Sequence, residues 1–271
     1  MTTTTPETAK LFQSAWEAAH AAGDLMRENW QRPKEISYKG AIDLVTSVDR
    51  DAERCIVNSL RQNFPDHSIL AEEETDVADS QESFRWIIDP LDGTTNFAHG
   101  YPQFCVSIAL EYQQDLLLGI VYDPLRRECF STIRGQGAKL NGQAICVSNL
   151  TELDQALLAT GFPYDCRDNP DFYLSYFRAF MTRSQGIRRA GAAALDLCYV
   201  ACGRLDGFWE LKLRPWDTAA ASLIVREAGG RISDFFGNEF SIHGNETMAT
   251  NGAIHAGMLD VIREIEEGKR H

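Results

Sequence analysis

The sequence lacks the features by which secreted and membrane proteins are recognised. Its first residues, Met1-Thr-Thr-Thr-Thr-Pro6, contain no basic patch followed by an apolar run, and no uncharged stretch reaches the roughly 18 residues of a membrane span. The seven cysteines are scattered and never spaced Cys-x-x-Cys. We therefore expect no secretory signal, no membrane association and a reducing, cytoplasmic location.

Positive charge is also scarce. The chain has 26 Lys and Arg residues against 39 Asp and Glu residues, a formal net charge of −13. Because binding to nucleic acid or to anionic lipid begins with a basic surface, we expect neither as a partner. An acidic protein that acts on phosphate needs a local source of positive charge, and a bound divalent metal ion supplies one.

Several common catalytic motifs are missing as well. The sequence has no Ser-His-Asp motif, no His-Glu-x-x-His zinc site and no Walker loop, and Gly135-Gln-Gly137 lacks the third glycine of a dinucleotide fingerprint. Leu91-Asp92-Gly93-Thr94 resembles part of the haloacid-dehalogenase motif, whose nucleophilic aspartate stands two residues before the second aspartate. Here that position is Pro90, which cannot attack phosphorus, so the sequence argues against a covalent aspartyl intermediate.

The first half of the chain is predicted to be rich in strands. With 271 residues, 44% of them hydrophobic, the chain suits one large domain or two closely joined halves. Apolar spacing of three to four predicts a helix over 11–30 and another over 52–60, closed by Pro65, with a loop at 38–43 between them. Consecutive β-rich runs then predict an antiparallel sheet, from strands at 68–71, 86–88, 104–110, 116–122 and 129–133.

The second half alternates between strands and helices. We predict strands at 157–160, 187–189 and 207–211, and helices at 172–182, 192–201 and 217–228. The fold class is therefore α/β (α+β), with layered sheets and helices. A soft boundary near Leu150 separates a half at 1–150 from a half at 151–271, and we expect the halves to form one compact unit and to meet at a cleft.

Acidic residues follow three of the apolar runs. Asp89 and Asp92 are the most informative, because Pro90 and Gly93 favour a turn that brings both carboxylates to one place. Like charges so close repel each other, and a hard cation relieves that repulsion. Glu72 to Glu74 alone would be interpreted as a solvated loop, and Asp217 alone as a helix N-cap. Direct attack by a metal-bound water is the mechanism that remains.

The segment Gly93-Thr94-Thr95-Asn96 is predicted to be a turn that leads into a helix. The free backbone N–H groups of such a helix start accept phosphate oxygens. A simpler interpretation is that the two threonines only cap the helix. The two interpretations are compatible, since a capped helix end beside a metal site is also an anion pocket.

At this point the sequence resembles the inositol monophosphatases, bacterial type, of the Mg²⁺-dependent, lithium-sensitive phosphatase superfamily. The resemblance covers nearly the whole chain, and its motifs occur in the family's order. They are Asp43-Leu-Val-Thr46-Ser-Val-Asp49, Ile69-Leu-Ala-Glu72-Glu73, Trp86-Ile-Ile-Asp89-Pro-Leu-Asp92-Gly-Thr-Thr-Asn96-Phe, Arg189-Ala-Gly191-Ala-Ala193, Trp216-Asp217-Thr-Ala-Ala and Glu227-Ala-Gly-Gly230.

The resemblance implies a set of metal-binding and catalytic residues. Two or three Mg²⁺ ions would be held by Glu72, Asp89, Asp92, Asp217 and the carbonyl group of Leu91, with Asp89 bridging two of them. The catalytic residues would be Glu72, Thr94 and Asp49. Thr94, hydrogen-bonded to Asp49, and Glu72 would position the attacking water.

The resemblance also implies the residues that bind substrate. Phosphate would be held by Gly93, Thr94 and Thr95, and the rest of the substrate by the stretch Gly191, Ala192 and Ala193 together with Glu210. From sequence alone Glu210 would be interpreted as an exposed charge at a strand end. Lys39 is a further candidate active-site residue. The chain departs from the family's usual pattern at Ala71 and at Ala192, and the second departure changes the pocket.

The activity implied is hydrolysis of myo-inositol monophosphate to inositol and phosphate. Fructose 1,6-bisphosphate, histidinol phosphate and 3′-phosphoadenosine nucleotides remain alternative substrates, since the metal site reads only the phosphate end. A regulatory binding protein that retains the fold is an alternative of another class. The family fold is a layered α-β-α-β-α sandwich, commonly a homodimer.

Overall fold

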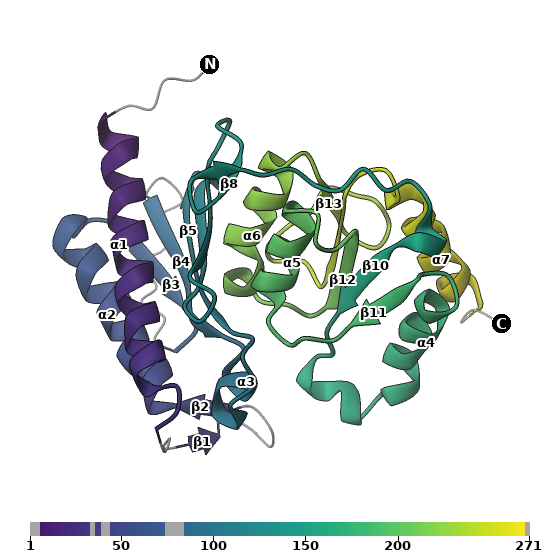
Figure 1. Ribbon diagram of the computed structural model, residues 1–271, viewed down its shortest axis with the longest axis horizontal. Helices are drawn as coiled ribbons and strands as arrows, with labels where there is room; N and C mark the ends of the chain where they lie inside the picture. Colours follow the sequence, from purple (N-terminus) through teal and green to yellow (C-terminus); the bar gives the residue numbers. More distant parts are fainter. Residues whose placement is uncertain (1–5, 33–35, 39–43, 74–83, 269–271) are drawn as a thin grey trace.

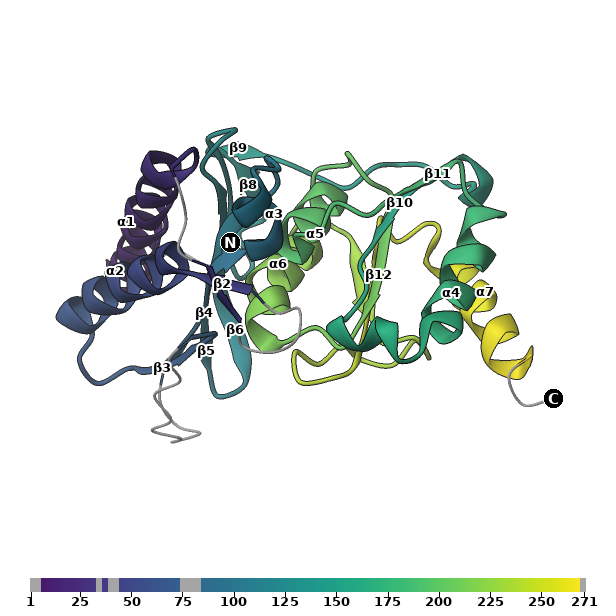
Figure 2. The same ribbon diagram turned by 90° about the horizontal axis from the view of Figure 1, so that it is seen from below.

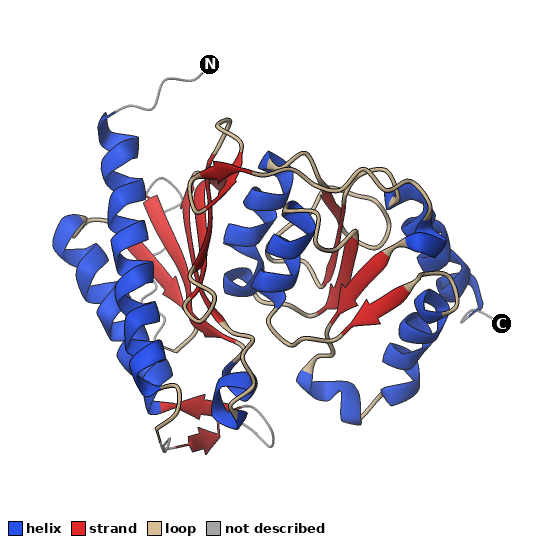
Figure 3. Ribbon diagram, in the orientation of Figure 1, coloured by secondary structure: helices blue, strands red, loops and turns tan. Residues whose placement is uncertain are grey.

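The structure is a computed structural model that describes residues 6–32, 36–38, 44–73 and 84–268. Helical layers and sheets alternate along its longest axis (Figure 1), and colouring by secondary structure makes the five layers plain (Figure 3). The view from below shows the same order (Figure 2). The predicted α-β-α-β-α sandwich is confirmed.

The first two layers come from the first half of the chain. Helices α1 (Pro6–Asn29) and α2 (Ser47–Asn63) cover the outer face of a sheet of seven strands in the order β3-β4-β5-β6-β7-β8-β9. A short antiparallel pair, β1 (Ile36–Tyr38) and β2 (Leu44–Thr46), precedes α2. The strands of the large sheet are β3 (Ser68–Ala71), β4 (Phe84–Asp92), β5 (Cys105–Tyr112), β6 (Asp115–Asp123), β7 (Glu128–Ile133), β8 (Ala138–Leu140) and β9 (Gln143–Ala144).

The prediction of an antiparallel sheet is wrong for one pair of strands. Strand β3 runs parallel to β4, whereas every other neighbouring pair in this sheet is antiparallel. Only strands joined by a short turn are obliged to be antiparallel. The lack of a predicted helix between two strands was therefore too weak a basis for their direction.

The middle layer consists of α5 (Ala193–Ala201) and α6 (Pro215–Glu227), which lie between the two sheets. Successive side chains of β4 point to opposite faces of the large sheet, and both faces are buried. Trp86 and Ile88 pack under α1 and α2, while Ile87 joins the core around α5 and α6. Nearly every residue of α5 is buried, as expected for a helix covered on both sides.

The last two layers come from the second half of the chain. A sheet of five strands has the order β11-β10-β12-β14-β13, and α4 and α7 cover its outer face. The 3₁₀ turns η1 (Leu153–Gln155) and η2 (Tyr164–Arg167) lie before and after β10 along the chain. The other elements are β10 (Leu157–Thr160), α4 (Pro170–Met181), β11 (Gly186–Arg188), β12 (Gly207–Leu211), β13 (Arg231–Ser233), β14 (Glu246–Thr250) and α7 (His255–Gly268).

Sequence reasoning found the predicted helices and strands within a few residues of their bounds but missed β1, β2, β8, β9, β13, β14 and α7. Strand β14 contains Thr247 and Thr250, whose buried hydroxyl groups hide its apolar pattern. No helix among the described residues is long and apolar enough to cross a membrane.

The middle layer packs so closely on the large sheet that one position has to be glycine. A Cβ atom added at Gly119 on β6 would lie 2.6 Å from the carbonyl oxygen of Ala220 on α6. Backbone atoms cannot move aside as a flexible side chain can. The position thus sets the distance between sheet and helix.

We expect Gly119→Ala to lower the free energy of unfolding by about 1–3 kcal/mol, because the new methyl group overpacks a backbone contact. Gly257→Ala is the matched control: its Cβ would have only one neighbour, Leu153, at 3.8 Å, and alanine is favoured within a helix. Urea unfolding of both variants measures this. Equal stability of the two would contradict the close approach.

Candidate active site

Strand β4 carries two buried carboxylates at its end. Asp89 and Asp92 are 2% and 8% exposed and pair with Ser107 and Cys105 across an irregularity in the ladder. The turn predicted around Pro90 is therefore wrong, since the strand continues through it with a bulge. Proline has no N–H group for the ladder and is tolerated where the pairing is already broken. The bulge aims both aspartates at the same region.

Gly93 connects this strand to α3 (Thr94–His99). Its φ is +95°, and a Cβ atom there would lie 2.8 Å from the carbonyl oxygen of Gln103. Only glycine fits both conditions. Gly93 itself is the N-cap residue, so the interpretation of Thr94 and Thr95 as caps is wrong, and their hydroxyl groups are not used for capping.

Thr94 is fixed by a residue from the first half of the fold. Its Oγ1 donates to Asp49 Oδ1 (2.9 Å), the contact that the resemblance implied, and lies 3.1 Å from the carbonyl oxygen of Leu91. Asp49 is 1% exposed and also accepts from the N–H and hydroxyl groups of Thr46 in a capping box. Burial raises the pKa of Asp49, while these hydrogen bonds lower it. The arrangement holds the Thr94 hydroxyl group in place.

Glu72 follows the end of β3 and lines the same cavity as Asp89. The next residue is anchored, because the Glu73 N–H group donates to Glu53 Oε2 (2.9 Å) on α2. Glu53 is 3% exposed, and sequence reasoning missed it. It gives the chain a fixed exit from β3 at the point where Glu72 faces the cavity.

Asp217 comes from the other half of the chain. The prediction that it is the N-cap of its helix is wrong: Arg214 is the N-cap, and Asp217 lies in the first turn of α6. Its Oδ2 accepts from the Arg214 N–H group (2.7 Å). Ser107 on β5 donates to the carbonyl oxygen of Trp216 (3.1 Å), which ties the start of α6 to the large sheet.

Asp92 joins the two halves directly. Its Oδ2 accepts from the Ala194 N–H group in the first turn of α5 (2.8 Å) and faces Cys105 Sγ at 3.6 Å. The positive end of a helix favours a carboxylate at this position. One oxygen of Asp92 is therefore committed to holding the halves together.

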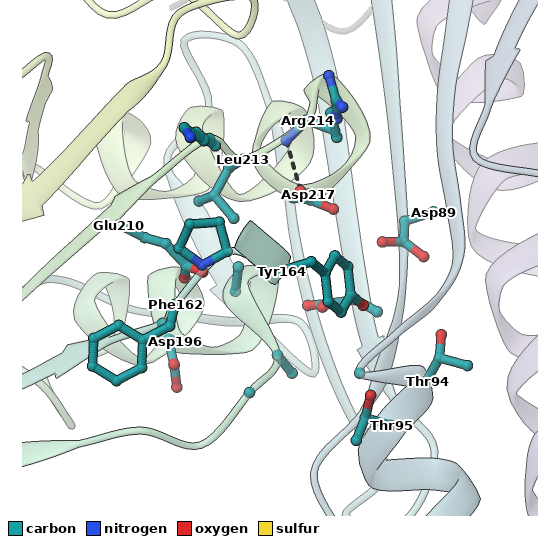
Figure 4. A pocket seen from close by; sticks show the side chains of 18 of the residues that line it. Asp89, Thr94, Thr95, Phe162, Tyr164, Asp196, Glu210, Leu213, Arg214 and Asp217 are labelled. Carbon is teal, nitrogen blue, oxygen red and sulfur yellow. Dashed lines mark hydrogen bonds between the residues drawn. The ribbon is translucent and has the colours of Figure 1, made fainter. Parts of the chain in front are cut away.

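These residues line one cavity of about 630 Å³. In Figure 4 Asp89, Thr94 and Thr95 lie on one side, with Asp217 above them and the Tyr164 ring between them and Glu210. Burial raises the pKa of Asp217 to about 7, with a further contribution from Asp92. Burial also raises the pKa of Asp89, with contributions from Glu72, Asp92 and Asp217. The site thus gathers four carboxylates, two of them buried, around one cavity.

The donor atoms of this cluster suit a hard divalent cation. All are oxygens, from four carboxylates and the Leu91 carbonyl group, and Mg²⁺ prefers such ligands while keeping several waters. Among the described residues no three His, Cys, Asp or Glu side chains already enclose a single ion site. The carboxylates instead line an open cavity, which leaves room for water and phosphate oxygens as additional ligands.

The opposite wall comes from the second half of the chain. Gly191 has a φ of +84°, and Ala192 and Ala193 are nearly fully buried where they meet the cavity. Glu210 on β12 lies against Gly161, where a Cβ atom would approach its carboxyl group to 2.1 Å. Burial raises the pKa of Glu210 well above its usual range, with Asp196 the next contribution.

The structure brings together every predicted site residue except Lys39, which lies outside the described residues. Asp49 stands behind Thr94, and the others line the cavity. Sequence reasoning missed Asp196, Asn96 and Gly161 as residues of this site. Asn96 belongs to a recognised motif, but two of its three partners are 94 and 95 residues away along the chain, so no local signal identified its role.

Comparison with known proteins assigns the chain that carries this site to a family. Residues 7–267 match the family model described as the inositol monophosphatase family. The chain belongs to the inositol monophosphatase family. Since the match spans all five layers, it covers both walls of the cavity.

Similar proteins carry two kinds of name. The Nus factor SuhB of Escherichia coli is 44% identical over 257 residues, covering 94% of this chain and 96% of that protein. The inositol-1-monophosphatase of Synechocystis is 47% identical over 245 residues, covering 90% and 85%. The inositol monophosphatase structure from Anabaena superposes with a TM-score of 0.87 at 39% identity, covering 95% and 97%.

Asn96 ties α3 to the Gly191 stretch across the cavity. Its Nδ2 lies 2.7 Å, 2.8 Å and 3.2 Å from the carbonyl oxygens of Gln103, Ala190 and Gly191. All three partners are acceptors, so the position requires a donor.

We expect Asn96→Asp to lower the free energy of unfolding by about 1–3 kcal/mol, because a carboxylate would face three carbonyl oxygens with nothing to donate. Asn63→Asp is the control, since this exposed amide donates only to the Ser59 carbonyl group (3.0 Å) at the end of α2. Thermal unfolding compares the two variants. An equally small loss of stability in both variants would show that the hydrogen bonds of Asn96 do not hold the Gly191 stretch in place.

Proposed function

We propose that this chain is a Mg²⁺-dependent phosphatase that hydrolyses a small phosphate monoester, with myo-inositol monophosphate as the preferred substrate. One observation carries the proposal: carboxylates from both halves of the chain share one cavity, where burial and then the charge of their neighbours raise the pKa of Asp89 and Asp217. Such a cluster stores repulsion that a divalent cation relieves. Membership of the inositol monophosphatase family supports the same activity.

Glu72, Asp89, Asp92, Asp217 and the Leu91 carbonyl group would hold two or three Mg²⁺ ions. Bound there, Mg²⁺ lowers the pKa of a water molecule and neutralises charge on the phosphate oxygens and the leaving alkoxide. Asp92 would bind through its free Oδ1, because Oδ2 already accepts from Ala194. Asp217 would likewise use Oδ1, since Oδ2 accepts from Arg214.

The chain's own groups would orient the reaction. Asp49 accepts a hydrogen bond from the Thr94 hydroxyl group, whose oxygen would then accept a hydrogen bond from the attacking water. Glu72, across the cavity, would accept the water's second proton. The backbone N–H groups after Gly93 and the Thr95 hydroxyl group would bind phosphate oxygens. Gly191, Ala192, Ala193 and Glu210 would contact the alcohol part of the substrate, with Lys39 as a further candidate.

Inositol monophosphate is favoured over the alternatives by Glu210, an acceptor for ring hydroxyl groups, and by similar proteins named for this activity. Fructose 1,6-bisphosphate, histidinol phosphate and 3′-phosphoadenosine nucleotides remain to be tested beside it. A cytoplasmic location, a homodimer, the absence of a nucleic-acid partner and the division into halves at 1–150 and 151–271 stay predictions.

A regulatory binding role is the second candidate, because relatives more than 40% identical are named Nus factor SuhB. The two roles are compatible in one chain. A purely regulatory protein would release no phosphate from any substrate under conditions in which it is folded. The assay that follows therefore separates the candidates.

We expect the purified protein to release phosphate from myo-inositol monophosphate with Mg²⁺ and to stop when a chelator removes the metal. Excess Ca²⁺ should inhibit, because Ca²⁺ prefers a larger and looser shell of ligands. Equal turnover with metal and with chelator would overturn the metal mechanism. Absence of turnover across the whole panel of substrates would favour the binding role.

We expect Asp89→Asn and Asp217→Asn each to lower kcat/KM more than about 100-fold, because each removes a charged ligand. Asp260→Asn is the control, an exposed aspartate of α7 that pairs only with Arg263 (2.7 Å), and it should leave the rate unchanged. Steady-state kinetics measure all three. Full activity in either site variant would remove that residue from the metal site.

A further inference from the structure

Asp196 is the one deeply buried aspartate in the described residues that accepts no hydrogen bond on its side chain. It is 2% exposed, in the first turn of α5. The other buried aspartates each accept at least one bond from a main-chain or side-chain donor, namely Asp49, Asp89, Asp92 and Asp123. A buried carboxyl group without a partner is costly, so its persistence requires an explanation.

The side chain of Asp196 faces the cavity of the active site rather than the apolar core. It lines the cavity beside Glu210, Phe162 and the stretch Gly191 to Ala193. Figure 4 shows Asp196, Glu210 and Phe162 together on the side away from Asp89 and Thr94. The carboxyl group therefore meets the part of a substrate that lies beyond the phosphate.

Glu210 shares this situation. Among the described residues no hydrogen bond or ion pair engages its carboxyl group, and Arg189 acts on both acids only through its charge, which lowers their pKa values. The acids influence each other electrostatically, and Asp196 is the largest charged contribution to the raised pKa of Glu210. Two neighbouring acid groups with open acceptor positions face the same space.

We propose that Asp196 is a second specificity-determining carboxyl of this cavity, and that Asp196 and Glu210 together bind hydroxyl groups of the alcohol that carries the phosphate. The inference rests on the proposed phosphatase function and deepens it. A hydroxyl group donates to a carboxyl oxygen with good geometry and no net charge to bury. The site then selects phosphate monoesters of polyols over those of apolar alcohols.

A purely structural role for Asp196 makes a different prediction. A carboxylate in the first turn of a helix stabilises that helix through its dipole. Removal of such a group would lower stability and affect every substrate alike. Discrimination between substrates therefore separates the two roles.

The test compares myo-inositol monophosphate with cyclohexyl phosphate, which has the same ring size and no free hydroxyl group. For Asp196→Ala we expect kcat/KM on the inositol ester to fall about 10- to 100-fold, mainly through KM, with cyclohexyl phosphate changed less than about twofold. For Asp196→Asn we expect a smaller loss on the inositol ester, because the amide oxygen still accepts one hydrogen bond. This variant keeps the shape of the side chain and tests the proposal should the alanine variant not fold.

Asp165→Asn is the matched control. Asp165 also lines the cavity, but its carboxylate is already engaged by Lys212 and by the Tyr173 hydroxyl group (2.8 Å). We expect the ratio of the two kcat/KM values to be the same as in the unmodified enzyme. Any change in this ratio as large as that of Asp196→Ala would overturn the assignment to Asp196.

The other outcomes are also decisive. Equal loss on both substrates, or no loss on either, overturns the role of Asp196 and leaves the phosphatase intact. If the unmodified protein hydrolyses neither ester with Mg²⁺, the proposed function fails, and the inference fails with it.

Discussion

The burial of several carboxylates close to one another is the constraint on which the rest of the site depends. Asp89 and Asp92 are buried and Asp217 is partly buried beside them in one cavity. Their raised pKa values express first the cost of removing a charged carboxylate from water and then the charge of the neighbouring carboxylates. A fold accepts such a cost where an ion is to be bound. The bulge in β4, the left-handed Gly93 and the close contact of sheet and helix at Gly119 all serve to hold these groups in one place.

Because of the middle helical layer, residues from both halves of the chain line the cavity. Helices α5 and α6 begin at the cavity, and their first turns supply Asp196 and Asp217. The Ala194 N–H group reaches Asp92, and Asn96 reaches back to the Gly191 stretch. The carboxylates around Asp89 and the wall around Gly191 are thereby fixed relative to each other. The proposed in-line displacement at phosphorus would need this precision, because most of its catalysis comes from positioning and charge stabilisation.

Local patterns in the sequence were sufficient for the layered fold and for the carboxylates at Asp89 and Asp92. Local patterns failed to predict features that depend on contacts between segments distant in the sequence. The continuation of β4 through Pro90 depends on a bulge opposite β5, and β14 is buried despite its threonine residues. The direction of β3 depends on its neighbour β4. The role of Asn96 arises from bonds to carbonyl groups 94 and 95 residues away, which no spacing along the chain displays. Asp196 meets Phe162 and Glu210 at the cavity only once the second half has folded.

Thermal unfolding in a series of Mg²⁺ concentrations tests most directly whether the clustered carboxylates form a cation site. A cation that binds the folded chain and not the unfolded chain raises the midpoint temperature as its concentration increases. At 100 times its Kd it adds about 2.7 kcal/mol to the free energy of unfolding. The account predicts such a rise for the unmodified protein at constant ionic strength, and a much smaller one for Asp89→Asn. A midpoint that does not change with Mg²⁺ in the unmodified protein would contradict it.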